Sequence, residues 1–128
     1  MERVTGIGGV FFRAADPAAM LGWYEEHLGL VPDDDRCAVL PWRHHDDPDR
    51  PGSTTWAPFP ADTTYFGPDP GSFMINYRVA SLDRMREQLR AAGVTVDDAT
   101  EESEFGRFGW FTDPEGNRAE LWEPPAGK

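Results

Sequence analysis

The sequence contains one cysteine, Cys37, and few basic residues. A single cysteine cannot form a disulfide within the chain, which fits a reducing compartment, so a cytoplasmic location is expected. Lys and Arg number 12 against 23 Asp and Glu, which gives a net charge of −11. Such an acidic surface repels phosphate backbones and anionic bilayers, so neither nucleic acid nor membrane partners are expected.

Long apolar runs and familiar catalytic motifs are missing as well. No stretch is long enough to span a bilayer, and the first nine residues lack the basic start and apolar run of a signal peptide. There is no G-x-S-x-G elbow and no P-loop, and the glycines of Gly6–Gly9 precede the strand core, unlike a dinucleotide fingerprint. Cys37 has no evident His partner and is interpreted as an inert strand residue.

Large aromatic residues, in contrast, are plentiful. The chain holds 5 Trp and 8 Phe among 128 residues. Such side chains usually fill a core and sometimes line a pocket for flat or apolar ligands. A chain of this length can bury a core without disulfide or metal support.

Two segments share one pattern. Thr5–Arg13 is typical of a buried strand, Asp16-Pro17 is typical of a helix start, and apolar residues then recur at helical spacing until Gly29. The second segment begins with a strand over Phe73–Val79. Ser81 is its N-cap candidate, a helix follows, and Gly93 ends that helix.

The two patterns can be superposed. Arg13 and Arg78 lie 65 residues apart, as do Met20 and Met85. Gly29 and Gly93 lie 64 apart, and so do the acidic pairs Asp33-Asp34 and Asp97-Asp98. The order of strand, helix, glycine and acidic turn therefore indicates an internal duplication.

Shorter runs typical of strands follow each unit. They cover Ala38–His44, Ser53–Phe59 and Thr63–Phe66 in the first half, and Phe108–Thr112 and Arg118–Glu123 in the second. The last two runs flank Asp113-Pro114-Glu115-Gly116, which suits a tight hairpin turn. Gly67–Gly71 is the expected linker between the halves.

The C-terminal segment carries a family resemblance. Its sequence from Asp113 to Pro124, DPEGNRAELWEP, resembles the DP-(D/E)-G-N-x-x-E-L-x-E-P signature of the glyoxalase/bleomycin-resistance/dioxygenase (vicinal oxygen chelate) superfamily. The start is similar too, with a strand ending in Arg13, then Asp16-Pro17, then a helix with Trp23-Tyr24 that closes on His27-Leu28-Gly29.

The resemblance implies an α+β fold of two tandem βαβββ modules whose sheets form an open cup. Residues 1–128 would form a single glyoxalase-like domain, with module 1 over about 4–66 and module 2 over about 72–124. It also implies a homodimer, because members of this superfamily often dimerise.

Metal-dependent members carry four ligands, one on the first and one on the fourth strand of each half. Glu120 matches the last ligand, but Gly9 and Met74 fall on two others, and the remaining position falls within Thr64–Phe66. One carboxylate does not hold a transition metal, so no metal and no cofactor are expected. His44 and His45 lead into an acidic loop and are expected to be solvated.

Strand alternation predicts which side chains face the cup. The predicted ligand-binding residues are Phe11, Trp56, Met74, Asn76, Arg78, Trp110, Glu120 and Trp122. Trp56 and Trp110 are included as wall residues, and alternation leaves open which face of the sheet they take. Glu120 is also the candidate catalytic residue, as a general base if burial raises its pKa. The alternative is that Glu120 forms a structural ion pair with Arg13, Arg78 or Arg118.

These observations favour a glyoxalase-like protein that binds a small molecule in an aromatic-lined cup without the usual metal. One alternative is a diverged enzyme of lyase, isomerase or dioxygenase-like type that acts on a small metabolite. Another is sequestration of a drug, as in bleomycin resistance, and a third is a domain whose cup is filled by side chains. The sequence leaves open whether any reaction is catalysed.

Overall fold

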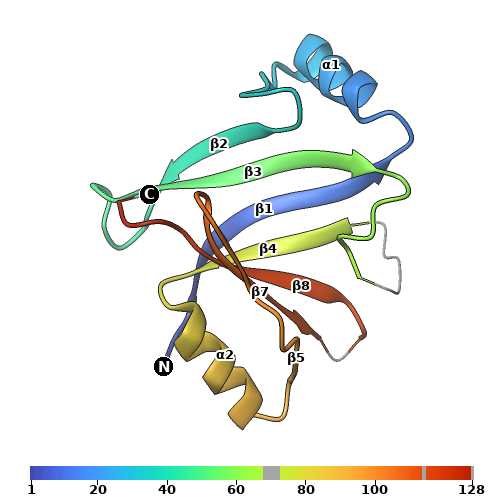
Figure 1. The fold of residues 1–128 in the computed structure, drawn as a ribbon. Helices are drawn as coiled ribbons and strands as arrows, with labels where there is room; N and C mark the ends of the chain where they lie inside the picture. Colours follow the sequence, from blue (N-terminus) through green and yellow to red (C-terminus); the bar gives the residue numbers. More distant parts are fainter. Residues whose placement is uncertain (68–72, 114, 128) are drawn as a thin grey trace.

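The computed structural model describes residues 1–67, 73–113 and 115–127 (Figure 1). Its first half contains β1 (Val4–Ala14), α1 (Pro17–Leu28), β2 (Ala38–Arg43) and β3 (Pro51–Pro60). Its second half contains β4 (Phe73–Val79), α2 (Leu82–Ala91), β5 (Thr95–Val96), β6 (Glu101–Ser103), β7 (Gly106–Thr112) and β8 (Arg118–Glu123). None of the described helices is long and apolar enough to cross a membrane.

Both helices begin and end at the predicted residues. The Asp16 carboxylate accepts a hydrogen bond from the Ala19 amide at 3.1 Å, which satisfies a free donor in the first turn of α1. Gly29, with φ of 68°, adopts the left-handed conformation that ends this helix. The Ser81 hydroxyl accepts from the Arg84 amide in α2, and Gly93 has φ of 81°.

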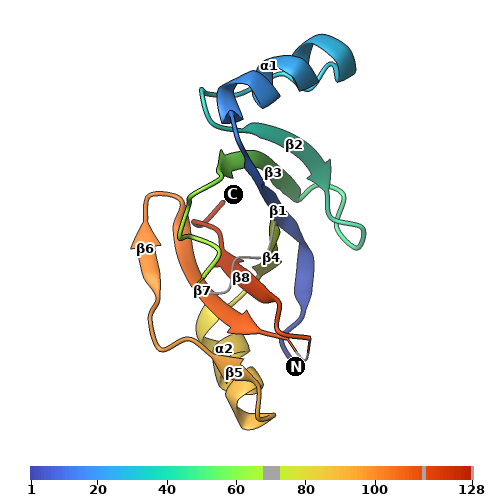
Figure 2. The ribbon, with the colours of Figure 1, turned by 90° about the vertical axis from the view of Figure 1, so that its right-hand side faces the viewer.

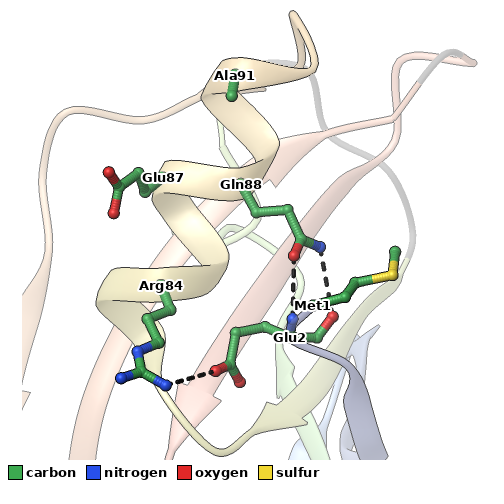
Figure 3. A pocket seen from close by; sticks show the side chains of 6 residues that line it. All are labelled: Met1, Glu2, Arg84, Glu87, Gln88 and Ala91. Carbon is green, nitrogen blue, oxygen red and sulfur yellow. Dashed lines mark hydrogen bonds and ion pairs between the residues drawn. The ribbon is translucent and has the colours of Figure 1, made fainter.

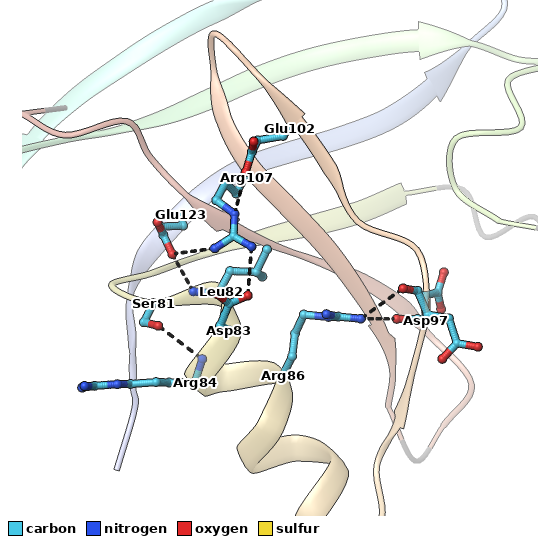
Figure 4. Close-up of polar contacts among 10 residues, drawn as sticks. Ser81, Leu82, Asp83, Arg84, Arg86, Asp97, Glu102, Arg107 and Glu123 are labelled. Atoms are coloured by element: carbon cyan, nitrogen blue, oxygen red, sulfur yellow. Dashed lines mark hydrogen bonds and ion pairs between the residues drawn. The ribbon is translucent and has the colours of Figure 1, made fainter.

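The start of α2 is also tied to the strands beside it (Figure 4). Glu123 of β8 accepts a hydrogen bond from the Leu82 amide at 2.8 Å. Arg107 of β7 forms ion pairs with Asp83, Glu102 and Glu123. Three strands and one helix terminus therefore meet around one guanidinium.

The strands form one sheet in the order β2-β3-β1-β4-β8-β7-β5, with β6 paired to β7. β1 and β4 are antiparallel at its centre, while β3 lies parallel to β1 and β8 lies parallel to β4. The arrangement on one side of the centre thus matches that on the other, as the predicted duplication requires. Figure 2 shows that the sheet curls rather than lying flat.

The central register defines the symmetry of the halves. Phe11 lies opposite Met74, and Gly9 lies opposite Asn76. A twofold axis between these two pairs exchanges Gly9 with Met74 and Phe11 with Asn76. Both exchanges correspond to the offset of 65 residues that the sequence predicts.

The two faces of the sheet bury different clusters. On the α2 face, Val79 and Leu121 pack against Leu82 and Met85. On the opposite face, which lines the cup, the buried cluster consists of Phe11, Ala57, Phe66, Met74 and Trp110. The predicted alternation along β4 and β8 is therefore correct for Met74, Val79 and Leu121.

The predicted α+β class with an open sheet is confirmed, but one predicted strand is wrong. The segment over Thr63–Phe66 forms a bend and a turn, in which the Thr63 amide donates to Pro60 O and the Gly67 amide donates to Thr64 O. Those bonds are local, so the segment does not join a ladder. β6 was not predicted, because its sequence, EES, is polar and exposed.

Two predicted features lie partly outside the described residues. They are the linker Gly67–Gly71, of which only Gly67 is described, and the turn between β7 and β8, of which Pro114 is not described. Around that turn, the Asp113 amide donates to Asn117 O at 2.9 Å, so the hairpin is closed as expected.

Candidate functional site

Glu120 is the polar centre of the cup face. It lies on β8, where the ladders place it beside Asn76 of β4 and Trp110 of β7. Only 1% of the residue is exposed. A carboxyl group so deeply buried needs hydrogen-bond partners, because its desolvation is costly.

Three uncharged side chains supply those partners. The Asn76 amide donates to Oε1 of Glu120 at 2.6 Å, and the Trp110 indole donates to Oε2 at 3.0 Å. The Tyr65 hydroxyl also donates to Oε2. Burial raises the pKa of Glu120, although these three hydrogen bonds act in the opposite direction.

Tyr65 reaches Glu120 from the turn after β3, a contact that the sequence analysis did not identify. Its ring stacks on Phe59 at 5.5 Å and meets Trp110 edge-on at 6.2 Å. Burial and the neighbouring carboxyl raise the pKa of the Tyr65 phenol, so it stays a hydrogen-bond donor. In the sequence, the one feature that drew attention to Tyr65 is its place within Thr64–Phe66, the range predicted to hold the fourth metal-ligand position.

The alternative role of Glu120, a structural ion pair with an arginine, has no such pair among the residues that the structure describes. Arg118 donates from Nη2 to Asp97 Oδ2 at 3.0 Å, and its guanidinium lies over the Trp110 ring. Arg13 donates from Nη1 to Ala61 O at 2.8 Å. The partners of Glu120 are thus the polar side chains that face it, rather than the nearest cations in sequence.

Seven of the eight predicted ligand-binding residues share the cup face or its edge, and Trp56 does not. The Trp56 ring packs on Phe12 at 5.1 Å and on Tyr24 of α1 at 4.7 Å. Its neighbour in β3, Ala57, belongs to the buried cluster of the cup. Because adjacent residues of a strand point to opposite faces, Trp56 lies on the α1 side.

A second group lies at the other end of the cup, around Arg78. The guanidinium of Arg78 lies 5.9 Å from the Trp42 ring and 5.7 Å from the Trp122 ring. Trp42 was not predicted to take part. The sequence feature that accompanies Trp42 is Gly52, which lies opposite Trp42 in the β2–β3 ladder. Any side chain at Gly52 would collide with the Trp42 indole.

His44 is buried rather than solvated, so that expectation is wrong. It is 5% exposed, and its ring packs edge-on against Trp42 at 5.0 Å. Within the described residues, its buried Nε2 atom has no hydrogen-bond partner. His45 is exposed, as expected.

The strand registers also correct the position of the fourth implied metal ligand. Glu120 pairs with Asn76, and the symmetry-related residue Phe11 pairs with Ala57. The counterpart of Glu120 is therefore Ala57, not a residue within Thr64–Phe66.

The implied metal does not fit these residues. Gly9 and Ala57 carry no donor atom, Met74 offers only a thioether, and the oxygens of Glu120 already accept from protein donors. Across the residues that the structure describes, no group of three or more His, Cys, Asp or Glu is placed to hold a metal ion.

One open hollow of about 320 Å³ lies outside the cup, between α2 and the N-terminus (Figure 3). Gln88 binds the Glu2 backbone there through both its oxygen and its nitrogen, and Arg84 forms an ion pair with Glu2. These polar side chains already hold the N-terminus on α2. We therefore assign the hollow a structural role.

The comparisons with known proteins agree with this geometry. The model of the glyoxalase-like domain family matches residues 9–122. The chain belongs to this family. The predicted superfamily and the glyoxalase-like fold class are thereby confirmed, and no curated relative matches the chain.

Solved structures of glyoxalase-like folds are similar to the chain. Methylmalonyl-CoA epimerase from Streptomyces coelicolor, in complex with 2-nitronate-propionyl-CoA, has a TM-score of 0.68 and 20% identity, covering 93% of this chain and 96% of that one. The epimerase from Mycobacterium tuberculosis has a TM-score of 0.60 and 22% identity, covering 95% and 89%. A catechol 2,3-dioxygenase has a TM-score of 0.56 and 21% identity, and 40% of its length is covered. At these identities the likeness establishes the fold alone.

Proposed function

We propose that this glyoxalase-like protein binds a small organic molecule in its cup without a metal ion. The observation that carries the proposal is Glu120, a buried carboxyl held by Tyr65, Asn76 and Trp110 where related proteins would use a metal ligand. Aromatic walls with a few convergent polar groups are typical of small-molecule sites.

The cup is not uniform along its length. At the Met74 end, side chains of the buried cluster pack against one another on the cup face, as in a hydrophobic core. At the other end, Trp42 and Trp122 stay partly exposed around Arg78. The proposed ligand therefore contacts the Arg78 end, with Asn76 and Glu120 beneath it.

NMR can test the proposal because the five tryptophans report on different places. We would record ¹⁵N-edited spectra of the indole N–H groups, assigned with Trp→Phe variants, in EDTA while adding a panel of small metabolites and aromatic compounds. Binding in the cup shifts the signals of Trp42, Trp110 and Trp122. Trp23 and Trp56, on the α1 side, serve as internal controls.

Shifts confined to Trp23 and Trp56 would contradict the proposal, as would shifts that need an added divalent metal. Analysis of the recovered compound by mass spectrometry then separates binding from catalysis.

A diverged enzyme is the second candidate, because burial raises the pKa of Glu120 toward the range of a general acid or base. Conversion of the ligand by the wild type and loss of conversion in Glu120→Gln would support that role. Recovery of an unchanged ligand would instead support sequestration. The homodimer and the cytoplasmic location stay predictions, and sedimentation velocity measures the first of them.

A further inference from the structure

Tyr65 differs from the other two donors that hold Glu120. Asn76 and Trp110 lie on β4 and β7, where the ladders fix their backbone. Tyr65 lies in the turn after β3, and its amide donates to the Thr63 hydroxyl at 3.2 Å, a bond within the same turn. Of the three donors, Tyr65 can therefore leave Glu120 without breaking the sheet.

The turn itself is held in place mainly by the neighbour of Tyr65. Phe66 is only 2% exposed and belongs to the buried cluster of the cup. The contact of Tyr65 O with the sheet is longer, since Arg118 donates to it from Nη1 at 3.4 Å, near the upper limit for a hydrogen bond. The turn can thus stay anchored through Phe66 while the Tyr65 side chain changes rotamer.

The Tyr65 ring fills a slot with flat walls. It stacks on Phe59 at 5.5 Å with 23° between the rings, and it meets Trp110 edge-on at 6.2 Å. At the inner end of the slot, its hydroxyl donates to Oε2 of Glu120. Stacked and edge-on contacts of this kind favour any six-membered ring, whether or not it belongs to the chain. The slot therefore suits a planar ring that carries a hydrogen-bond donor at its far end.

Tyr65 also lies between the buried carboxyl and the surface. Glu120, Asn76 and Trp110 are 1%, 2% and 4% exposed, whereas Tyr65 is only partly buried. A ligand that approaches Glu120 through this slot meets Tyr65 first. Because a buried carboxyl that loses a donor is costly, a ligand that displaces Tyr65 must supply a donor of its own.

The donors around Glu120 indicate the chemistry of such a ligand. All three are uncharged: an amide, an indole and a phenol. An anionic group would be repelled by the carboxyl and by a chain whose net charge is −11. An uncharged hydroxyl can take over the bond that the Tyr65 hydroxyl makes, so Glu120 keeps the same number of donors.

We propose that Tyr65 occupies the ligand's place in the free protein, and that a planar ring with a hydroxyl group binds by displacing Tyr65 from Glu120. This inference rests on the proposed function and extends the same site from the Arg78 end of the cup into the slot that Tyr65 fills.

Two probes of nearly equal shape test it. 4-Methylphenol is the tyrosine side chain as a free molecule, and 4-fluorotoluene lacks the donor. Protein labelled with 3-fluorotyrosine reports the displacement by ¹⁹F NMR, because the chain has three tyrosines and Tyr65→Phe assigns one signal. 4-Methylphenol should shift the Tyr65 signal, while Tyr24, on α1, and Tyr77, on the α2 face, keep theirs. It should also bind at least about tenfold more tightly than 4-fluorotoluene.

Tyr65→Phe gives a second, opposite test. The variant keeps the ring but lacks the bond to Glu120 that a ligand must break. In calorimetric titrations, 4-methylphenol should therefore bind Tyr65→Phe about 5- to 100-fold more tightly than the wild type. Tyr24→Phe is the matched control and should leave this affinity unchanged. Both variants keep an aromatic ring, so neither result depends on a cavity left by the substitution.

Equal or weaker binding of 4-methylphenol by Tyr65→Phe overturns the inference, because Tyr65 would then not compete with the ligand. Equal binding of 4-fluorotoluene overturns it too, since the hydroxyl would not matter. A Tyr65 signal that stays in place while the cup tryptophans shift overturns it and leaves the proposed function standing. Absence of 4-methylphenol binding at millimolar concentration in wild type and Tyr65→Phe likewise contradicts it, and the wider panel then decides the proposed function separately.

Discussion

At the scale of single residues, the sequence predicts the position of Glu120 but not its hydrogen-bond partners. The sequence identifies it through the C-terminal signature, and alternation correctly turns it toward the cup. Its partners come from β4, β7 and the turn after β3, which lie far apart in sequence. Cross-strand register decides these contacts, and no local pattern encodes it.

The raised pKa of Glu120 predicts how stability depends on pH. A carboxyl whose pKa is higher in the folded state than its unfolded value of 4.5 stabilises the fold below that value, and the contribution is lost as pH rises through the folded pKa. Glu120→Gln lacks this titration. In urea unfolding from pH 4 upward, the wild type should therefore lose stability relative to Glu120→Gln.

Glu87→Gln, on the exposed side of α2, is the matched control, and its difference from the wild type should not follow the same course. The opposite result would be a free energy of unfolding that rises with pH in the wild type relative to Glu120→Gln. That result would mean that the fold stabilises Glu120 as the anion, and it would contradict the prediction.

The Tyr65 hydroxyl gives a second test at this scale. Tyr65→Phe keeps the ring between Phe59 and Trp110 but removes a donor to the buried carboxyl, which should lower the free energy of unfolding by about 1–3 kcal/mol. Tyr24→Phe, on α1, should change it by less than about 0.5 kcal/mol. Equal values for the two variants in urea titrations would show that the Tyr65 contact contributes nothing.

At the scale of elements, the helices and most strands could be predicted from sequence. Asp16, Ser81, Gly29 and Gly93 mark the helix ends through local hydrogen bonds and backbone conformation, so short-range reasoning suffices. The segment over Thr63–Phe66 misled that reasoning, because its Thr and aromatic residues resemble a strand. Tyr65 and Phe66 instead fill the cup from a turn.

The cap of α2 can be tested directly. Ser81→Ala removes the acceptor for the Arg84 amide and should lower stability by about 1 kcal/mol. Glu123→Ala removes the acceptor for the Leu82 amide from the same helix end. Hydrogen exchange of the first turn of α2 should speed up in both variants (Figure 4).

Ser53→Ala, the same change as Ser81→Ala but in β3, should leave that exchange unaltered. Unchanged protection of α2 in Ser81→Ala would contradict the assigned capping role.

At the scale of the whole molecule, two similar halves share one sheet through β1 and β4. The offset of 65 residues predicts a duplication, and the register of β1 with β4 relates Gly9 to Met74 by the same offset. The pairing of Arg78 with Trp42 and Trp122 could not, because it joins β2, β4 and β8 across both halves. Sequence reasoning therefore located the cup but only part of what lines it.

The symmetry relates four positions in the cup, which correspond to the metal-ligand positions that the family resemblance implies. The four related positions carry Gly9, Ala57, Met74 and Glu120, and only the last has an oxygen donor. Both oxygens of the Glu120 carboxyl accept hydrogen bonds from side chains of the protein. Metal-free ligand binding is thus the central claim about this molecule.

The metal content of the untagged protein tests that claim most directly. We would incubate the protein with nickel, zinc, iron and manganese, remove unbound ions, and measure the retained metal by elemental mass spectrometry. Retention far below one ion per chain, equal in wild type and Glu120→Gln, is the predicted result. Near-stoichiometric metal that Glu120→Gln abolishes would contradict the account and restore a metal-dependent mechanism to the cup.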